Sequence, residues 1–423
     1  MIINTARIDA VFAQVLGLNI FALFAVGVSV HGLFGQLSLV LLLVSIIYLI
    51  WKRPACSLNR AERLYLYSSV LFPLAIVGSL FLHGTNDWGH LDNPLRLVLV
   101  LPVYFAVRFS GVKIDYLHWG IVVGAIVVGI DAIHQRHVLG IGRVYGHVSY
   151  LNFPITFGNM ALLLGMLSPL CFSSIYQRIG WTARGLVVLA FGLGVYASLL
   201  SGTRGGWISI PFLLLVLSVS LGYTSKRSKI FVVLASMMII VGAYYLVPSV
   251  SVRVDSALNE IIHIYSSGSF VGASVGTRLE MWYTALLAFM DSPFLGLGLG
   301  NYYEFKFAQI DIGEVSSGIR SYHYAHNEPL HYLAEMGLLG FIPLMLVYAS
   351  WLAMSLANQS KVPLQNNIAL MGLMIVLLRF DIGLTQVQFV YHFTSIFYIM
   401  LFAIVAGFMS KPGESQLTQD SQR

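Results

Sequence analysis

The sequence predicts an all-α polytopic membrane protein with about twelve transmembrane helices and one large loop of amphipathic helices between spans 9 and 10. Of its 423 residues, 57% are hydrophobic and only 10% are charged, and the mean hydropathy is +0.80. The apolar residues form repeated runs of roughly 20 residues, the length that a helix needs to cross the hydrocarbon of a bilayer. These runs lack the alternating pattern of barrel strands, so we expect a helical bundle.

The predicted spans divide the chain into four parts. Spans 1 to 9 lie in 1–248, a loop occupies 249–337, spans 10 to 12 lie in 338–410, and 411–423 is a polar tail. Asp9 interrupts the first apolar run and no small-residue cleavage site follows, which indicates a signal anchor rather than a cleaved signal peptide. We expect the spans near residues 10–29, 32–51, 64–82, 94–108, 117–134, 154–173, 184–200, 206–222, 230–248, 338–356, 365–384 and 391–410.

The distribution of basic residues predicts the orientation. Most of the 24 lysine and arginine residues fall on the loops of one side, which marks that side as cytoplasmic. We therefore expect both termini in the cytoplasm and the loop 249–337 on the outer face. The net charge of +6 follows from this bias and indicates no nucleic-acid partner. The sequence contains no G-x-x-x-x-G-K-[ST] motif, so we expect no nucleotide either.

The outer loop is expected to contain three helices. The first is VRVDSALNEIIHIY at 252–265, and the second is TRLEMWYTALLAFM at 277–290, ended by Asp-Ser-Pro. After a glycine-rich turn, HNEPLHYLAEMG predicts a third helix that begins at Asn327, has Pro329 in its first turn and ends at Gly337. Helices of this kind lie over the outer mouth of a bundle and partly in the headgroup layer.

Arg278 is a candidate anion-binding residue. Thr277 and Glu280 fit a capping box, which would place Arg278 in the first turn of its helix. There the helix dipole is positive, so an anion would be held by free N–H groups and the guanidinium together. The alternative is a solvated arginine or a partner for Glu280.

Arg204 and Arg143 are two further outer-face arginines with glycine neighbours. Arg204 lies in SGTRGGW (201–207), a short hairpin between two apolar spans, where glycines allow close approach and Trp207 suits the membrane interface. Arg143 lies in GRVYGH. Guanidinium groups pair bidentately with phosphate oxygens, so several together suit a diphosphate leaving group. The alternative for Arg204 is a side chain that reaches lipid phosphate.

His326 is the best candidate for an acid–base group because an imidazole titrates near neutral pH and this one directly precedes a helix. The next residue, Asn327, and the nearby His323 are possible supporting residues. The cluster His323, His326 and His331 also suggests a metal, but its spacing is not that of a zinc motif, so we expect no metal. A structural histidine that hydrogen-bonds the loop is the other alternative.

Two charged pairs lie near the outer ends of spans. Arg379 and Asp381 in LLRFDIG either neutralise each other or support binding. Asp92 and Arg96 have i, i+4 spacing, which favours a structural pair.

The order of these motifs resembles the O-antigen ligase family, within the wider superfamily of lipid-linked oligosaccharide ligases, polymerases and protein O-oligosaccharyltransferases. The resemblance rests on SGTRGGW in an outer hairpin, RLEMW at 278–282 and HNEPLHYLAEMGLLG at 326–340. It implies a bacterial inner-membrane glycosyltransferase with a periplasmic active site. The donor would be a glycan on undecaprenyl pyrophosphate and the acceptor a sugar hydroxyl of lipid A–core.

The resemblance also implies roles for single residues. Arg204 and Arg278 would bind the pyrophosphate, with Arg143 as a weaker third, and His326 would deprotonate the acceptor hydroxyl. No metal, nucleotide or other cofactor is implied, and direct displacement would invert the anomeric centre. Three alternatives stay open: an O-antigen polymerase, a protein O-oligosaccharyltransferase, and, in another class, a transporter or flippase for a polyprenyl-linked glycan.

Overall fold

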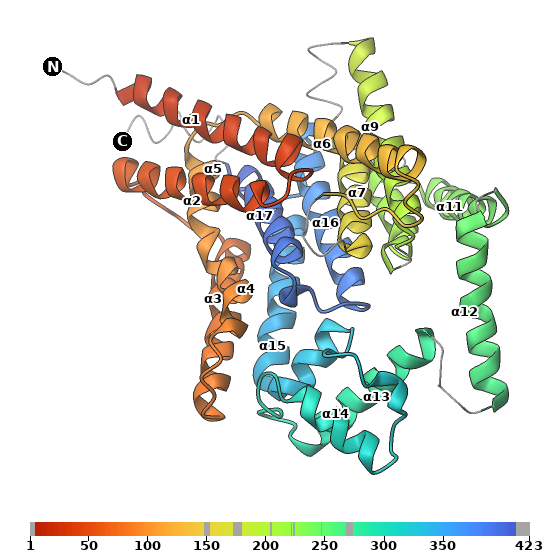
Figure 1. The fold of residues 1–423 in the computed structure, drawn as a ribbon. Coiled ribbons are helices and arrows are strands. Elements are labelled where there is room, and N and C mark those ends of the chain that lie inside the picture. The colour runs from red at the N-terminus through yellow and green to blue at the C-terminus, as the bar shows by residue number, and fades with distance from the viewer. Residues whose placement is uncertain are drawn as a thin grey trace.

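The protein is a bundle of α-helices in the computed structural model, which describes residues 5–147, 153–171, 180–203, 205–220, 222, 225–246, 248–267 and 274–411. Within these ranges all the regular elements are helical and none is a strand, which confirms the predicted all-α class. Figure 1 shows α13 and α14 together at one end of the molecule, below α15, and α1, α2 and α6 at the opposite end.

The elements run in this order: α1 (Thr5–Ala22), η1 (Leu23–Gly27), α2 (Leu33–Lys52), α3 (Arg60–Leu82), α4 (Gly89–Leu99), α5 (Leu101–Phe109), α6 (Asp115–Ile133), η2 (His134–Val138), α7 (Pro154–Leu167), η3 (Ser168–Cys171), α9 (Trp181–Ser201), η4 (Gly205–Trp207), α10 (Ile210–Ser220), α11 (Lys226–Leu246), α12 (Pro248–Ser267), α13 (Ser274–Asp291), α14 (Tyr302–Asp311), η5 (Ser317–Ile319), α15 (Glu328–Ala357), α16 (Pro363–Gly383), η6 (Gln388–Val390) and α17 (His392–Met409).

Nine helices of the described part are long and apolar enough to cross a membrane, and each coincides with one of the twelve predicted spans. The other three predictions fall on different features. The range 94–108 covers α4 and α5, two short helices that meet at Val100. The range 206–222 covers the short apolar stretch Gly205–Ser220, and 230–248 falls on α11. The count of twelve therefore stays a prediction.

Close backbone contacts bring the central helices together. A Cβ atom at Gly194 in α9 would lie 2.7 Å from the Cα atom of Gly165 in α7. A Cβ atom at Gly124 in α6 would lie 2.1 Å from the carbonyl oxygen of Phe24 in η1. Glycine is required at these crossings, as expected for helices that associate in lipid by packing of small residues.

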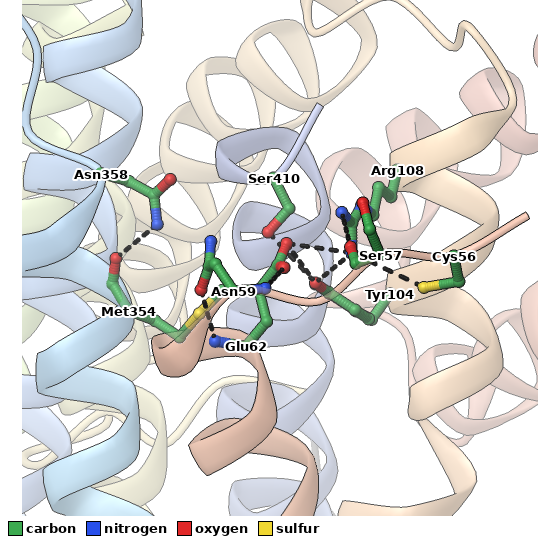
Figure 2. A network of polar contacts seen from close by, with 9 residues as sticks. All are labelled: Cys56, Ser57, Asn59, Glu62, Tyr104, Arg108, Met354, Asn358 and Ser410. Atoms are coloured by element: carbon green, nitrogen blue, oxygen red, sulfur yellow. Dashed lines mark hydrogen bonds and ion pairs between the residues drawn. The ribbon is translucent and has the colours of Figure 1, made fainter. Parts of the chain in front are cut away.

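A buried polar network closes the end of the bundle opposite α13 and α14. Figure 2 shows that Glu62 at the start of α3 meets Arg108 at the end of α5, and the two side chains lie 3.0 Å apart. The Tyr104 hydroxyl donates to Glu62 and also contacts Ser410 after α17. Asn59 caps α3 and forms a capping box with Glu62. Glu62 and Arg108 are 2% and 9% exposed, so this ion pair is shielded from solvent.

The segment 249–337 contains the three predicted helices as α12, α13 and the first part of α15, together with α14, which the sequence did not indicate. α15 begins after the Asn327 cap with Pro329 in its first turn, as expected. The predicted end at Gly337 is a break, with φ +56° and ψ −147°, after which the helix resumes and crosses the bundle.

The glycine-rich turn explains this break. Leu338 N–H donates to the carbonyl oxygen of Pro293, and Leu297 N–H donates to that of Ala334, so the α13–α14 connection runs directly against the kink. A Cβ atom at Gly296 would lie 2.3 Å from the backbone of Glu335, and Gly296 itself has a φ of +73°. The turn and the kink therefore hold α13, α14 and α15 as one unit.

Candidate functional site

His326 occupies a strained position directly before α15. Its φ is +48°, in the left-handed region, which costs a residue with a Cβ atom about 1 kcal/mol. The neighbouring Asn327 explains how it is held: its side-chain oxygen accepts from Leu330 N–H at 3.0 Å, and its amide donates to the Leu384 carbonyl oxygen at 3.2 Å. Asn327 therefore positions His326 against the end of α16.

The imidazole of His326 is half-buried and neutral. Its ring meets that of Tyr322 edge to face, with centroids 5.4 Å apart. Burial, and secondly the positive charge of Arg278, lower the pKa of His326 to about 4. Both effects disfavour the imidazolium. At neutral pH one ring nitrogen is therefore an acceptor for a proton.

Arg278 lies beside His326, but not in the helix position that the sequence predicted. α13 begins at Ser274, so Thr277 is not its cap and Arg278 is its fifth residue, in the second turn. Glu280 does not reach back to Thr277; its carboxylate instead accepts from Ser316 N–H and Oγ, at 3.1 and 2.5 Å. The predicted capping box is wrong because the helix extends one turn further towards the N-terminus.

The N-terminus of α13 also differs from the predicted anion site. Val275 N–H donates to the carboxylate of Glu260 in α12 at 2.8 Å, so a side chain of the protein itself already meets the helix dipole. Any anion bound at Arg278 is therefore held mainly by the guanidinium group.

The hairpin 201–207 packs between α7 and the end of α16. Arg204 itself lies outside the described residues. Thr203 Oγ1 donates to the Pro154 carbonyl oxygen at 3.0 Å, and a Cβ atom at Gly205 would lie 2.7 Å from Oγ1 of Thr385. Arg143 contacts the first residue of this hairpin: its Nε donates to the Ser201 carbonyl oxygen at 2.8 Å.

The end of α16 joins the hairpin to the loop. Thr385 contacts Gly205 of the hairpin, and the preceding Leu384 accepts from Asn327, next to His326. Arg143 contacts the hairpin at Ser201, and the charge of Arg278 lowers the pKa of His326. These contacts bring the segments around residues 143, 205, 278 and 326 into one region. These segments are up to about 180 residues apart in the sequence.

Arg379 and Asp381 do not pair with each other. Arg379 lies 3.1 Å from Glu328, and both are buried, at 2% and 0% exposed. Asp381 instead accepts from the Ser209 hydroxyl, just after the hairpin. The two side chains point to different partners because they are two residues apart on a helix and so project from different faces.

Glu328 is a positioning residue that the sequence analysis missed. Besides Arg379, its carboxylate accepts from the N–H groups of Gln388 and Phe389, at 2.7 and 2.9 Å, and from the Tyr348 hydroxyl. It thereby fastens the first turn of α15 to α16 and η6. The available signal was Arg379 itself, since an arginine inside an apolar span requires a buried partner.

The three histidines of the loop occupy separate environments. The exposed ring of His323 stacks on Tyr303, with centroids 4.5 Å apart. His331 is buried, with Nε2 3.4 Å from a carboxylate oxygen of Glu335. No group of three or more potential ligands that could hold a metal ion occurs among the described residues. The Asp92–Arg96 pair forms as expected, at 3.5 Å, and Arg96 also donates to the His392 carbonyl oxygen.

The fold and site define an all-helical, multi-pass membrane protein whose candidate site lies where the start of α15 meets α13 and the end of α16. The model of the O-antigen ligase family matches residues 187–345, from α9 to the kinked α15, and supports the assignment of the chain to this family. A curated protein of Haemophilus influenzae, described only as uncharacterized, is 24% identical over 313 residues, which are 73% of this chain and 76% of that protein.

Proposed function

We propose that the protein is an O-antigen ligase of the bacterial inner membrane. It transfers a glycan from undecaprenyl pyrophosphate to a sugar hydroxyl of lipid A–core on the periplasmic face. The observation that supports this most is the neutral His326 beside Arg278, at a strained position held by Asn327. The matched family includes membrane enzymes that act on lipid-linked glycans, which agrees with this site.

The reaction is a single displacement. A ring nitrogen of His326 takes the proton of the acceptor hydroxyl as its oxygen forms a bond to the anomeric carbon. The bond from that carbon to the pyrophosphate oxygen breaks, and the electron pair leaves with undecaprenyl pyrophosphate. Because the attack comes from the opposite face, the anomeric configuration inverts.

The arginines stabilise the leaving group. Negative charge develops on the pyrophosphate as the bond breaks, and guanidinium groups of Arg278, Arg204 and Arg143 would pair with its oxygens. Arg278 has two effects. It attracts the diphosphate, and its charge adds to burial in lowering the pKa of His326, so that the imidazole is unprotonated before the reaction. No metal ion or nucleotide takes part in the proposed reaction.

A transporter is the second class of function, and one observation weighs against it. Alternating access requires the cytoplasmic ends of helices to separate. In this protein the start of α3, the end of α5 and the residue after α17 are joined by the buried Glu62–Arg108 network, which links these helices across that end of the bundle. The charged residues proposed to act also gather at the other end of the bundle.

The test is transfer by the purified protein. The protein, a lipid-linked glycan donor and two competing acceptors, lipid A–core and a second donor molecule, are incubated with and without a chelator. The expected product is glycosylated lipid A–core, unaffected by the chelator and absent with His326→Ala. Chain extension of the donor would identify a polymerase, and the absence of transfer to either acceptor would favour transport.

A further inference from the structure

A small polar pocket lies next to the proposed catalytic loop, between the start of α4, the first part of α15 and the start of α17. Its volume is about 230 Å³, below the roughly 300–1,000 Å³ of pockets for drug-sized ligands. The size suits one small polar unit rather than a lipid diphosphate. Its lining includes His90, Asn93, Tyr324, His331, Tyr332 and Glu335.

Two buried polar atoms of the lining residues have no hydrogen-bond partner within the described protein: Nδ1 of His331 and Oδ1 of Asn93. The two residues are 3% and 6% exposed. The other polar atom of each faces a protein group: His331 Nε2 lies 3.4 Å from Glu335, and Asn93 Nδ2 donates to the Phe389 carbonyl oxygen at 2.6 Å. Buried polar atoms normally have partners, so these two indicate a polar ligand that forms hydrogen bonds.

The contact with Glu335 determines which nitrogen of His331 is left without a partner. The Glu335 carboxyl group accepts backbone N–H groups of Gly300 and Tyr302, which holds it at the start of α14. Nε2 of His331 faces this carboxyl group at 3.4 Å, so Nδ1 is the ring nitrogen left for a ligand.

The walls disfavour an anion and favour a sugar. The lining contains no lysine or arginine, whereas Asp87 and Glu335 both belong to it. A phosphate group would therefore meet carboxylates and acceptor atoms. The rings of Tyr324 and Tyr332 both contact that of His331, with centroids 5.4 and 5.6 Å away, and aromatic faces attract the polarised C–H groups of a sugar ring.

The pocket is near His326 and open on its outer side. Tyr324 and His331 flank His326 in the chain, and His326 and His331 interact electrostatically. At the mouth, Asp87 and His392 are each 72% exposed. A sugar unit can therefore enter between Asp87 and His392, and once bound it lies near His326, which can accept a proton.

We propose that this pocket, the acceptor pocket, binds an uncharged sugar unit of the acceptor glycan next to the hydroxyl that attacks the donor. This inference rests on the proposed function and adds the residues that select the acceptor. Sugar hydroxyls, which can donate as well as accept, form hydrogen bonds with His331 Nδ1 and Asn93 Oδ1, while the tyrosines pack against the ring.

The experiment measures the KM of the purified full-length protein for acceptor and donor separately. His331→Phe keeps a ring of similar size but removes Nδ1, so we expect the acceptor KM to rise about tenfold. The donor KM and kcat should change less than about twofold. His90→Ala at the pocket rim is a milder variant that tests the same surface if His331→Phe does not fold, with an expected rise of about threefold.

The matched control is His137→Phe in η2, a histidine outside the pocket that contacts Tyr196. It should leave both KM values unchanged. An unchanged acceptor KM in monodisperse His331→Phe and His90→Ala, or a fall in kcat alone, would overturn the proposal.

A binding measurement separates this inference from the proposed function. The oligosaccharide released from lipid A–core is added to wild-type protein and to His331→Phe, and saturation-transfer NMR reports bound sugar protons. Signal in the wild type that is lost in His331→Phe supports the acceptor pocket even where no transfer occurs. Equal signals in both proteins contradict it even where transfer is normal.

Discussion

His326 has two unusual properties: its backbone is held in the left-handed region, and the pKa of its imidazole is lowered to about 4. The left-handed φ is maintained because Asn327, the next residue, is tied both to α15 and to Leu384. Burial and Arg278 together keep the ring neutral. A base that is already unprotonated needs only a hydroxyl within reach, so positioning matters more at this residue than its basicity.

The lowered pKa of His326 predicts an unusual pH profile. The group is neutral above about pH 4 and becomes protonated only below it, so kcat/KM should be constant from pH 8 to pH 6 and fall as the pH approaches 4. The measurement is the initial rate at low substrate concentration across this range, since kcat/KM reports the free enzyme.

Arg278→Gln provides the control for this profile. Removing the positive charge should raise the midpoint of the acid limb in the residual activity of the variant. A wild-type midpoint near the ordinary value for histidine, about 6.5, would show that the environment of His326 is not the one described.

The arginines are expected to act through their shape as well as their charge. Arg278→Lys and Arg204→Lys keep the charge but lose the bidentate fork, so each should lower kcat/KM for the donor about a hundredfold, or about 2.7 kcal/mol. Arg320→Lys, at an exposed position of the same loop, is the control and should be neutral. Normal turnover in both first variants would exclude the pyrophosphate clamp.

The Glu328–Arg379 pair predicts a stability effect that depends on which charge is removed. Glu328→Gln alone leaves Arg379 buried without its carboxylate and should destabilise the protein by about 3–5 kcal/mol. The double variant Glu328→Gln, Arg379→Met removes both charges and should recover part of this loss. Thermal unfolding in detergent measures both.

The exposed Lys52–Asp9 pair supplies the contrast. Its side chains are 40% and 29% exposed, so Asp9→Asn should cost less than about 1 kcal/mol. Equal losses for Asp9→Asn and Glu328→Gln would mean that the buried pair is not part of what holds α15 in place.

Among the elements, the start of α15 could be predicted and the start of α13 could not. The α15 boundary depends on local signals, the Asn327 cap and Pro329, which sequence displays directly. α13 extends back to Ser274 because Glu260 of the preceding helix meets its first N–H groups. That contact, like the pairing of Arg379 with Glu328 across 51 positions, depends on how distant segments pack.

The kink in α15 predicts that one glycine cannot be replaced. Gly337 has a φ and ψ that only glycine adopts readily, and a Cβ atom there would lie 2.5 Å from the Pro293 carbonyl oxygen. Gly337→Ala should destabilise the unit of α13, α14 and α15 by about 2–3 kcal/mol and increase amide exchange in residues 293–299. Gly185→Ala in α9, where a Cβ atom meets open space, is the matched control and should not destabilise the protein. Equal exchange in both variants would contradict the role of the kink.

For the whole molecule, composition and periodicity predicted the class because hydrophobic runs are a property of the sequence itself. The nine candidate spans within the described residues all fall on predicted ones. The remaining three predictions show the limit: at 94–108 an apolar run is broken into two short helices at Val100, and hydropathy does not report such a break. The contacts that bring the hairpin and the start of α15 to the end of α16 likewise follow from packing, which residue spacing does not report.

The orientation of the bundle gives a last prediction, because the proposed reaction requires the loop with His326 to be periplasmic. Exposed positions near the two ends of α15 can be labelled with a thiol reagent after Cys56, an exposed thiol, is replaced by serine. Ser317→Cys, in η5 beside the site, should react with a membrane-impermeant maleimide in cells whose outer membrane alone is permeabilised. Gln359→Cys, just after α15 at the other end of the bundle, should react only after the inner membrane is opened. The opposite pattern would place His326 in the cytoplasm, away from lipid A–core being completed at the outer face, and would refute the proposed ligase.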